Sequence, residues 1–107
     1  MTDILRSINK RLTKYCGFSI CKYSEFPSDF AHDHIDIIRS VQPFTMTSPE
    51  KLYSLIQGVK YIVQNRVPGD IVECGVWRGG SMMAVAHTLL RLNHTEKSLF
   101  LYDTFSG

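Results

Sequence analysis

The sequence predicts an α/β fold in which N-terminal helices precede a βαβ unit, the first part of an incomplete parallel sheet. Two observations support this prediction. Apolar residues recur at helical spacing through the first part of the chain, and from residue 71 two short apolar segments flank a glycine-rich turn and a helical pattern. Because two parallel strands are normally extended by further strands and covered on both faces, we expect residues 43–107 to be the truncated start of a longer domain, preceded by a helical region at residues 1–42.

Composition and charge exclude several classes of protein. The chain of 107 residues is 44% hydrophobic and has a formal net charge of +2, too small to favour a nucleic-acid partner. It has neither an apolar stretch long enough to span a membrane nor the apolar core of a signal peptide. Its three cysteines, Cys16, Cys21 and Cys74, lack zinc-type spacing. We therefore expect a cytoplasmic protein with free thiols and no membrane partner.

The first helix is expected to be basic and amphipathic. Residues 1–22 carry five basic residues against Asp3. Four apolar residues recur there at helical spacing: Ile4, Leu5, Ile8 and Leu12. We expect a surface helix whose apolar stripe faces the core, and attachment to an anionic membrane or a partner is the alternative.

Two further helices are expected before the strands. The shorter is marked by Ile35, Ile38 and Val41. Pro43 ends it, and residues 32–34 (His-Asp-His) are expected to form a solvated loop instead of a metal site. The longer helix begins after a cap at Thr47 or Ser48 and ends before Pro68. Its apolar stripe consists of Leu52, Leu55, Ile56, Val59, Ile62 and Val63.

From residue 71 the periodicity changes. The segments "IVEC" (71–74) and "SLFLYD" (98–103) are typical of buried strands, and residues 81–92 between them of a helix. One face of this helix carries Met82, Val85, Ala86 and Leu89. A strand, a helix and a second strand in this order predict a βαβ unit with parallel strands.

The turn between the first strand and its helix is rich in glycine. The segment "IVECGVWRGGS" (71–81) places Gly75, Gly79 and Gly80 where the strand passes into the helix. Glycines let the backbone turn tightly and let a ligand approach, while the first amides of the helix favour a polar or anionic group. The middle glycine of the dinucleotide fingerprint is absent, which weakens the case for a nicotinamide site. A tight turn without a ligand is the alternative.

An acid lies at the end of each strand. Glu73 precedes the first glycine by two residues, and Asp103 follows the second strand. Ligands of open α/β sheets bind at this edge, where Glu73 could attract the cationic groups of S-adenosylmethionine and Asp103 could hold ribose hydroxyls. We therefore predict that both carboxylates face a common cleft that binds a nucleoside. A helix cap is the alternative for Asp103.

Two segments resemble a known family. "PFTMTSPEKLYSLIQGVKYIVQNRVPGDIVECGVWRGGSMMA" and "LYDTFSG" closely resemble the macrocin O-methyltransferase (TylF/MycF) family over about residues 43–107. The resemblance implies a Rossmann-like class I methyltransferase fold, S-adenosylmethionine as methyl donor, and a hydroxyl of a sugar or polyketide-type natural product as acceptor. It also implies a magnesium ion held by acids outside this chain, and it leaves a homo-oligomer open.

The same resemblance assigns cofactor contacts to particular residues. They are Thr45, Met46, Glu73, Cys74, Gly75, Val76, Trp77, Asp103, Thr104, Phe105, Ser106 and Gly107. Ser81 could donate to the cofactor carboxylate, although starting the helix is its simpler role. No catalytic residue is identified, so the chain alone is expected to be catalytically incomplete. A nicotinamide-dependent oxidoreductase fragment and a non-catalytic truncated domain are the alternatives.

Overall fold

The computed structural model describes residues 3–17 and 25–106. Its helices are α1 (Asp3–Cys16), α2 (His32–Val41), the 3₁₀ helix η1 (Gln42–Phe44), α3 (Pro49–Gln64) and α4 (Gly80–Arg91), and its strands are β1 (Ile71–Cys74) and β2 (Leu99–Tyr102). Cys21, Lys22 and Gly107 lie outside the described residues. Within those described, Cys16 and Cys74 are free thiols, and no helix combines the length and apolarity that crossing a membrane requires.

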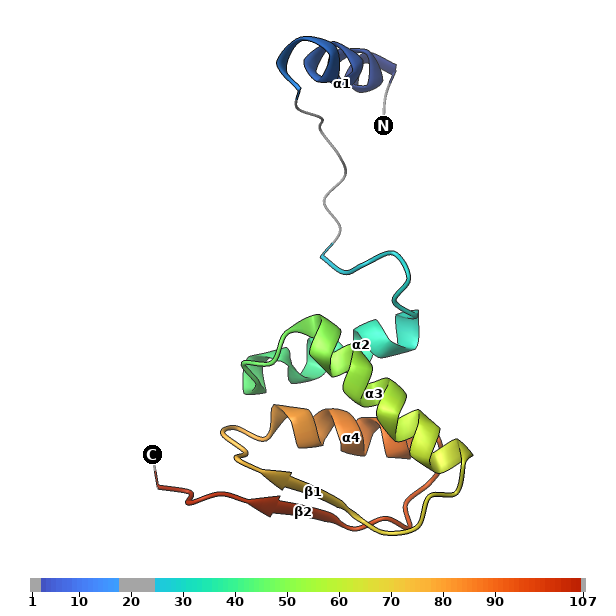
Figure 1. The fold of residues 1–107 in the computed structure, drawn as a ribbon, viewed down its shortest axis with the longest axis vertical. Coiled ribbons are helices and arrows are strands. Elements are labelled where there is room, and N and C mark those ends of the chain that lie inside the picture. Colours follow the sequence, from blue (N-terminus) through green and yellow to red (C-terminus); the bar gives the residue numbers. More distant parts are fainter. Residues whose placement is uncertain (1–2, 18–24, 107) are drawn as a thin grey trace.

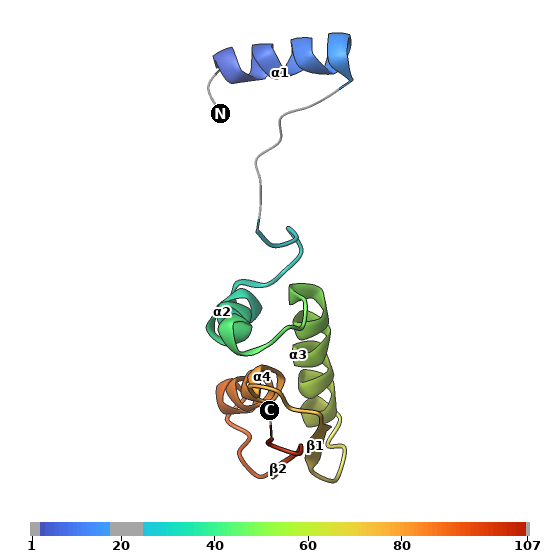
Figure 2. The same ribbon diagram turned by 90° about the vertical axis from the view of Figure 1, so that its left-hand side faces the viewer.

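Helix α1 forms as predicted but does not face a core. None of its residues is buried, and its apolar residues Ile4 and Tyr15 are 72% and 76% exposed. Figures 1 and 2 show α1 apart from the other helices. The expected core-facing stripe is therefore wrong for the described structure, because no other described element covers it.

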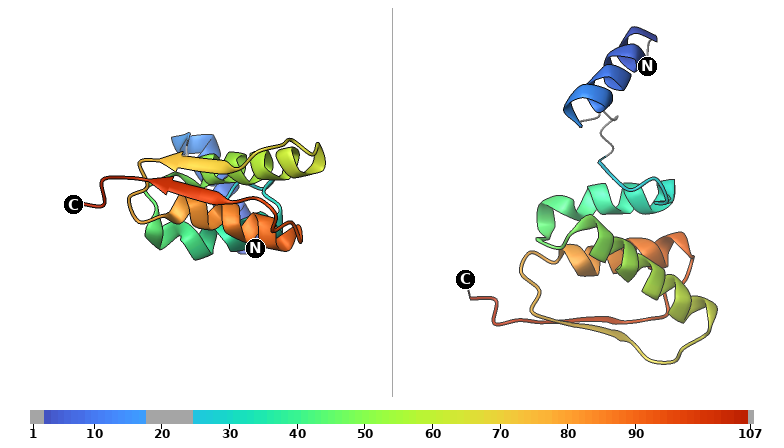
Figure 3. Two further views of the ribbon diagram at one scale, coloured as in Figure 1. Left: turned by 90° about the horizontal axis from the view of Figure 1, so that it is seen from below. Right: turned by 45° about the horizontal axis from the view of Figure 1, so that its top comes forward.

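The two strands form the predicted parallel pair. Ile71 lies opposite Leu99 and Cys74 opposite Tyr102, with α4 as the crossover. The expectation of buried strands is wrong, since Val72, Phe100 and Tyr102 are 56%, 44% and 59% exposed. Alternate residues of a strand point to opposite faces, and helices α3 and α4 cover one face only (Figure 3).

The buried core has two parts. One lies among helices α2, α3 and α4 and contains Phe26, Ile37, Ile38, Val41, Leu52, Ile56 and Ala84. The other lies between the helices and the sheet and contains Val59, Met82, Val85 and Leu89, with Ile71 and Leu99 packed against it. Figure 1 shows α4 between α2 and the strands. The predicted division of the chain after residue 42 stays a prediction, although α2 shares the first core with α3 and α4.

Helix α4 carries small residues on the side that meets α2 and η1. Gly80, Ala84 and Thr88 recur every four residues and are buried, so they lie on one face of the helix. A Cβ atom at Gly80 would lie 2.6 Å from the backbone of Phe44 and from the Cβ of Thr45. Gly80 is therefore needed for close approach, and this contact holds the segment after η1 against the start of α4.

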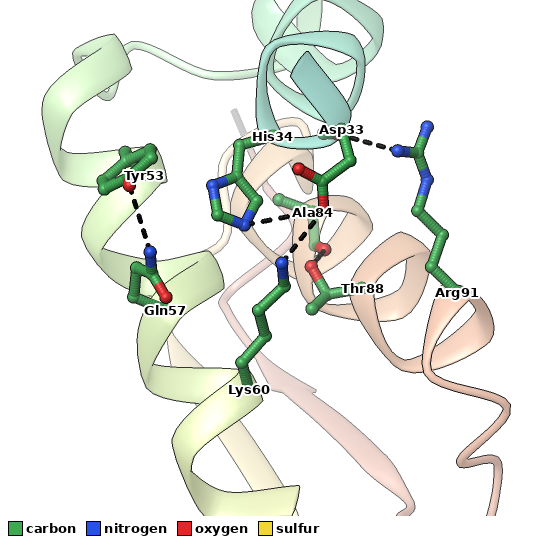
Figure 4. A network of polar contacts seen from close by, with 8 residues as sticks. All are labelled: Asp33, His34, Tyr53, Gln57, Lys60, Ala84, Thr88 and Arg91. Atoms are coloured by element: carbon green, nitrogen blue, oxygen red, sulfur yellow. Dashed lines mark hydrogen bonds and ion pairs between the residues drawn. The ribbon is translucent and has the colours of Figure 1, made fainter. Parts of the chain in front are cut away.

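A polar network joins helices α2, α3 and α4 (Figure 4). Lys60 Nζ donates to Asp33 Oδ2 over 2.9 Å, and Arg91 donates to the Asp33 carbonyl over 2.8 Å. His34 is 2% exposed, stands edge-on to the Tyr53 ring, and has no hydrogen-bond partner for either ring nitrogen among the described residues. The expected solvated loop at residues 32–34 is thus wrong: it is the first turn of α2, and helical spacing turns His34 inward beside Ile37 and Ile38.

The close contact at Gly80 yields a first prediction. Gly80→Ala should destabilise the chain by about 1–3 kcal/mol, because the backbone of Phe44 must move. Gly58→Ala, at an exposed helical position where an added Cβ meets nothing within 4 Å, should stabilise it by up to about 1 kcal/mol. Urea unfolding of both variants measures the difference, and equal behaviour would show that the contact is not tight.

The buried imidazole yields a second prediction. Burial lowers the pKa of His34 below its ordinary 6.5, the charges of Lys60 and Arg91 act in the same direction, and Asp33 opposes them. The unfolded chain therefore takes up a proton more readily than the folded chain as pH falls below about 6.5. Stability should be fully present above that pH and decrease below it. Unfolding measured across this range should show a weaker pH dependence in His34→Leu and an unchanged one in the control His32→Gln, whose side chain is exposed.

Candidate functional site

The carboxyl ends of both strands border a cleft. The amide of Gly75 donates to the carbonyl of Tyr102 over 2.8 Å, which continues the strand pairing into the turn. The turn after β1 and the segment after β2 therefore lie side by side (Figure 1). Between them is a cleft of about 510 Å³ lined by Gly75, Trp77, Asp103, Phe105 and Ser106. All five residues belong to the set that the sequence assigned to a cofactor.

Backbone conformation explains the glycines of this turn and singles out two aromatic residues. Gly75 and Gly79 have φ angles of 82° and 83°, which favour glycine. Trp77 and Phe105 also adopt left-handed φ, 48° and 51°, where bulky residues are rare. Both side chains line the cleft and are exposed, and the Arg78 guanidinium lies 4.8 Å from the centroid of the Trp77 ring. Strained residues of this kind concentrate at ligand-binding sites.

Asp103 ties the two strand ends together. Its Oδ2 accepts hydrogen bonds from the amides of Val76 and Trp77, at 2.6 and 3.2 Å. Its Oδ1 accepts from the amides of Thr104 and Phe105, at 2.7 and 3.4 Å. These bonds, that from Val76 most strongly, lower the pKa of Asp103, so the carboxylate is negative. The same carboxylate that lines the cleft thus also holds its backbone walls in place.

Glu73 is in a different environment. It lies on the half-buried side of β1, like Ile71, and its Oε2 is buried without a hydrogen-bond donor among the described residues. Burial raises the pKa of Glu73, the Ser81 side chain opposes that rise, and the negative charge of Asp103 adds to it. The prediction that both carboxylates face a common cleft is therefore wrong for Glu73: Asp103 lines the cleft, whereas Glu73 lies on the half-buried side of β1 and is not among the lining residues.

The segment after η1 reaches the same turn. Thr45 is half buried and its Cβ lies against Gly80, while its Oγ1 accepts a hydrogen bond from the amide of Thr47 over 3.0 Å. Met46 follows and is 79% exposed. The sequence signal for this contact was the second of two consecutive glycines. Gly79 has a left-handed φ, whereas Gly80 does not, so the glycine at position 80 is explained by the close approach of Thr45 and not by its backbone conformation.

The remaining predicted residues surround the cleft without lining it. Val76 is buried, Cys74 is exposed on the open face of the sheet, and Thr104 is exposed with its hydroxyl 3.3 Å from Asp103 Oδ1. Gly107 lies outside the described residues. The expectation that Ser81 starts the helix is wrong, because α4 begins at Gly80 with Gly79 as its N-cap. Sequence reasoning missed that Asp103 accepts hydrogen bonds from the turn after β1, since the two segments meet only once β2 pairs with β1.

A larger cavity, of about 670 Å³, lies at the opposite edge of the sheet. It is lined by residues after α3 and before β2, among them Arg66, Asp70, His94 and Lys97. The Lys97 ammonium there donates to the carbonyls of Val67 and Gly69, at 2.8 and 2.6 Å. These bonds join the segment before β2 to the segment before β1. Ligands of open α/β sheets bind at the carboxyl ends of the strands. The smaller cleft is therefore the better candidate despite its size.

No cluster of three or more His, Cys, Asp or Glu side chains able to hold a metal ion occurs in residues 3–17 and 25–106. The magnesium ion that the family resemblance implies thus finds no ligand set in this part of the chain. The expectation that its ligands lie elsewhere stays a prediction.

Comparison with known proteins identifies relatives of one kind. The chain is 35% identical over 63 residues to demethyldecarbamoylnovobiocin O-methyltransferase of Streptomyces niveus, a match that covers 59% of this chain and 24% of that relative. It is 36% identical over 63 residues to 8-demethyl-8-(2,3-dimethoxy-alpha-L-rhamnosyl)-tetracenomycin-C 4'-O-methyltransferase of Streptomyces olivaceus, covering 59% and 24%. It is 32% identical over 63 residues to mycinamicin III 3''-O-methyltransferase of Micromonospora griseorubida, covering 59% and 25%.

The matched segment spans about a quarter of the length of these relatives. No solved structure gives a significant match. The family model described as Macrocin-O-methyltransferase (TylF) matches residues 7–107 and so extends the resemblance beyond residues 43–107, into α1. Because this match covers nearly the whole chain, the chain belongs to the macrocin O-methyltransferase (TylF) family of O-methyltransferases.

Proposed function

We propose that this chain forms the S-adenosylmethionine-binding part of an O-methyltransferase with a Rossmann-like fold. The observation that carries the proposal is the cleft at the carboxyl edge of the sheet. All five of its lining residues, including two strained aromatic residues, are positions that the family pattern assigns to the cofactor. Membership of the family supports a methyl donor as the ligand of this cleft.

The residues present fit this cofactor. The exposed rings of Trp77 and Phe105 offer apolar surface to an adenine, and Asp103 offers carboxylate oxygens to ribose hydroxyls beside the bare backbone of Gly75. Glu73 supplies a negative charge whose buried oxygen lacks a donor, as suits a ligand that carries positive charge. Thr45, which lies against Gly80 at the start of α4, borders the same turn, and the exposed Met46 follows it.

Bound S-adenosylmethionine supplies an electrophilic methyl group. Trp77, Asp103 and Phe105 would hold it, and it would supply the methyl group that an acceptor oxygen takes while the hydroxyl proton passes to a base. No such base is assigned within this chain, and its contribution is to bind and align the donor. The names of the relatives support a hydroxyl of a sugar or a related natural product as the acceptor.

Calorimetric titration with S-adenosylmethionine tests the proposal. The chain should bind it, and Glu73→Gln should bind about tenfold more weakly, because a nearby counter-charge in a partly buried site contributes on the order of 1–2 kcal/mol. Glu96→Gln removes the same charge at the opposite edge of the sheet and should have no effect. Binding of a nicotinamide dinucleotide without binding of S-adenosylmethionine would overturn the assignment, and absence of both would favour a non-catalytic domain.

A substitution at Asp103 tests whether the carboxylate both binds the cofactor and stabilises the turn. Asp103→Asn places an amide where a carboxylate oxygen now accepts two backbone N–H groups, so one pair of bonds is lost whichever way the amide points. Both cofactor affinity and the midpoint of thermal unfolding should therefore fall. Binding lost without any change in unfolding would show that the bonds to the turn add nothing to stability.

A further inference from the structure

Trp77 occupies a turn position that ordinarily favours glycine. The Gly79 amide donates to the Val76 carbonyl over 2.9 Å and closes a turn in which Trp77 and Arg78 are the two central residues. Trp77 has a φ of 48°, whereas Arg78 is not among the residues with positive φ. A turn with positive φ at its first central residue alone usually has glycine there, because a side chain at that position is strained. The fold therefore holds an indole ring at this point in spite of backbone strain.

The backbone of Trp77 is fixed, but its ring is not enclosed. Asp103 Oδ2 accepts hydrogen bonds from the amides of Val76 and Trp77, which ties the turn to the end of β2. Trp77 lines the cleft and is 52% exposed. An exposed side chain samples several rotamers, and a ligand that binds against one of them loses affinity through the ordering of the others. The affinity of the cleft therefore depends on what restrains the ring.

Arg78 lies against the ring on the side away from the cleft. Its guanidinium is over the indole, 4.8 Å from the ring centroid. In residues 3–17 and 25–106, no other cationic group and no aromatic ring lies over this indole. Arg78 is not a lining residue of the cleft, so its guanidinium covers the face of the ring that the ligand does not reach. The other face of the ring is left for a flat group.

We propose that Arg78 is a positioning residue of the cofactor site, whose guanidinium holds the Trp77 indole so that its free face meets the adenine of S-adenosylmethionine. This inference rests on the proposed function and concerns a residue that the family pattern did not assign. The charge of Arg78 selects the adenine, because a second cation such as the sulfonium is repelled by the guanidinium behind the ring. A neutral, flat base stacks on an indole without that repulsion.

This role predicts an effect opposite in direction to that of charge repulsion. The guanidinium and the sulfonium are both cationic, so removal of Arg78 would strengthen binding of S-adenosylmethionine if charge alone acted. Loss of the restraint on Trp77 weakens binding instead. A direct ion pair between Arg78 and the carboxylate of the cofactor would also make its removal weaken binding, but only for ligands that have this carboxylate. Methylthioadenosine contains the adenosine and the sulfur without the amino-acid part, and therefore separates these two cases.

The test uses the full chain and three variants. Arg78→Ala removes the guanidinium, Arg78→Lys retains a cation that can lie over the ring, and Arg11→Ala removes an exposed guanidinium from α1. Trp77 is the only tryptophan of the chain, so tryptophan fluorescence reports on this ring alone. Time-resolved anisotropy without ligand measures the angle over which the ring moves. Calorimetry measures the affinities for S-adenosylmethionine and methylthioadenosine.

We expect the indole to move over a wider angle in Arg78→Ala, over an intermediate angle in Arg78→Lys, and as in the unmodified chain in Arg11→Ala. Arg78→Ala should bind both ligands about two- to fivefold more weakly, by the same factor for each. The midpoint of thermal unfolding should not change, because Arg78 is exposed. Stronger binding, a loss confined to S-adenosylmethionine, or a lowered unfolding midpoint would each overturn the inference.

The two proposals fail in different ways. An indole that moves no more in Arg78→Ala than in the unmodified chain overturns the role of Arg78 whether or not the cofactor binds. Unchanged affinity for both ligands in Arg78→Ala overturns that role alone and leaves the proposed function intact. A chain that binds neither ligand overturns the proposed function, and with it the role of Arg78 toward the adenine, even where the indole moves more freely in Arg78→Ala.

Discussion

The packing of α4 on two sides at once is the constraint on which the rest of this structure depends. Its small residues Gly80, Ala84 and Thr88 allow α2 and η1 to pack closely against one side. Its larger residues Met82 and Val85 pack against α3 and the sheet on the other side. Small side chains allow close approach of backbones, and large ones fill the wider gap above a sheet. Because α4 is clamped in this way, its first turn is fixed in position, and the segment after η1 and the end of β1 are brought to it.

The site that results uses its two acids differently. Asp103 has four backbone amides as donors and is held firmly in its charged form, so it serves as a rigid link between the strand ends. Glu73 has a buried oxygen without a donor in the part of the chain that the structure describes, and burial raises its pKa. A carboxylate with several amide donors organises the backbone, and a buried carboxylate oxygen without a donor leaves interaction energy for a ligand. Both arrangements follow from one tight turn between a strand and a helix.

Much of the fold could be predicted from the sequence because its signals are local. The glycine turn and the apolar spacing of α3 and α4 each depend on neighbours within a few residues, and the structure contains both. Ser48 is the N-cap residue of α3, as one of the two predicted positions, but its side chain makes no capping hydrogen bond. The inward turn of His34 and the exposure of Val72 were not predictable in this way. The first depends on how α2 seats against α3, and the second on which face of the sheet the helices cover.

The sequence by itself determined the order of the elements, the parallel pairing of the strands, the family, and the residues that line the cleft, because motif and periodicity are properties of contiguous segments. Only the tertiary structure decided that Asp103 spans both strand ends and that Thr45 abuts Gly80. Those contacts join residues from different elements, so their partners are chosen by packing. The physical reason is that a hydrogen bond or a close backbone contact requires positions in space, which spacing along the chain does not specify.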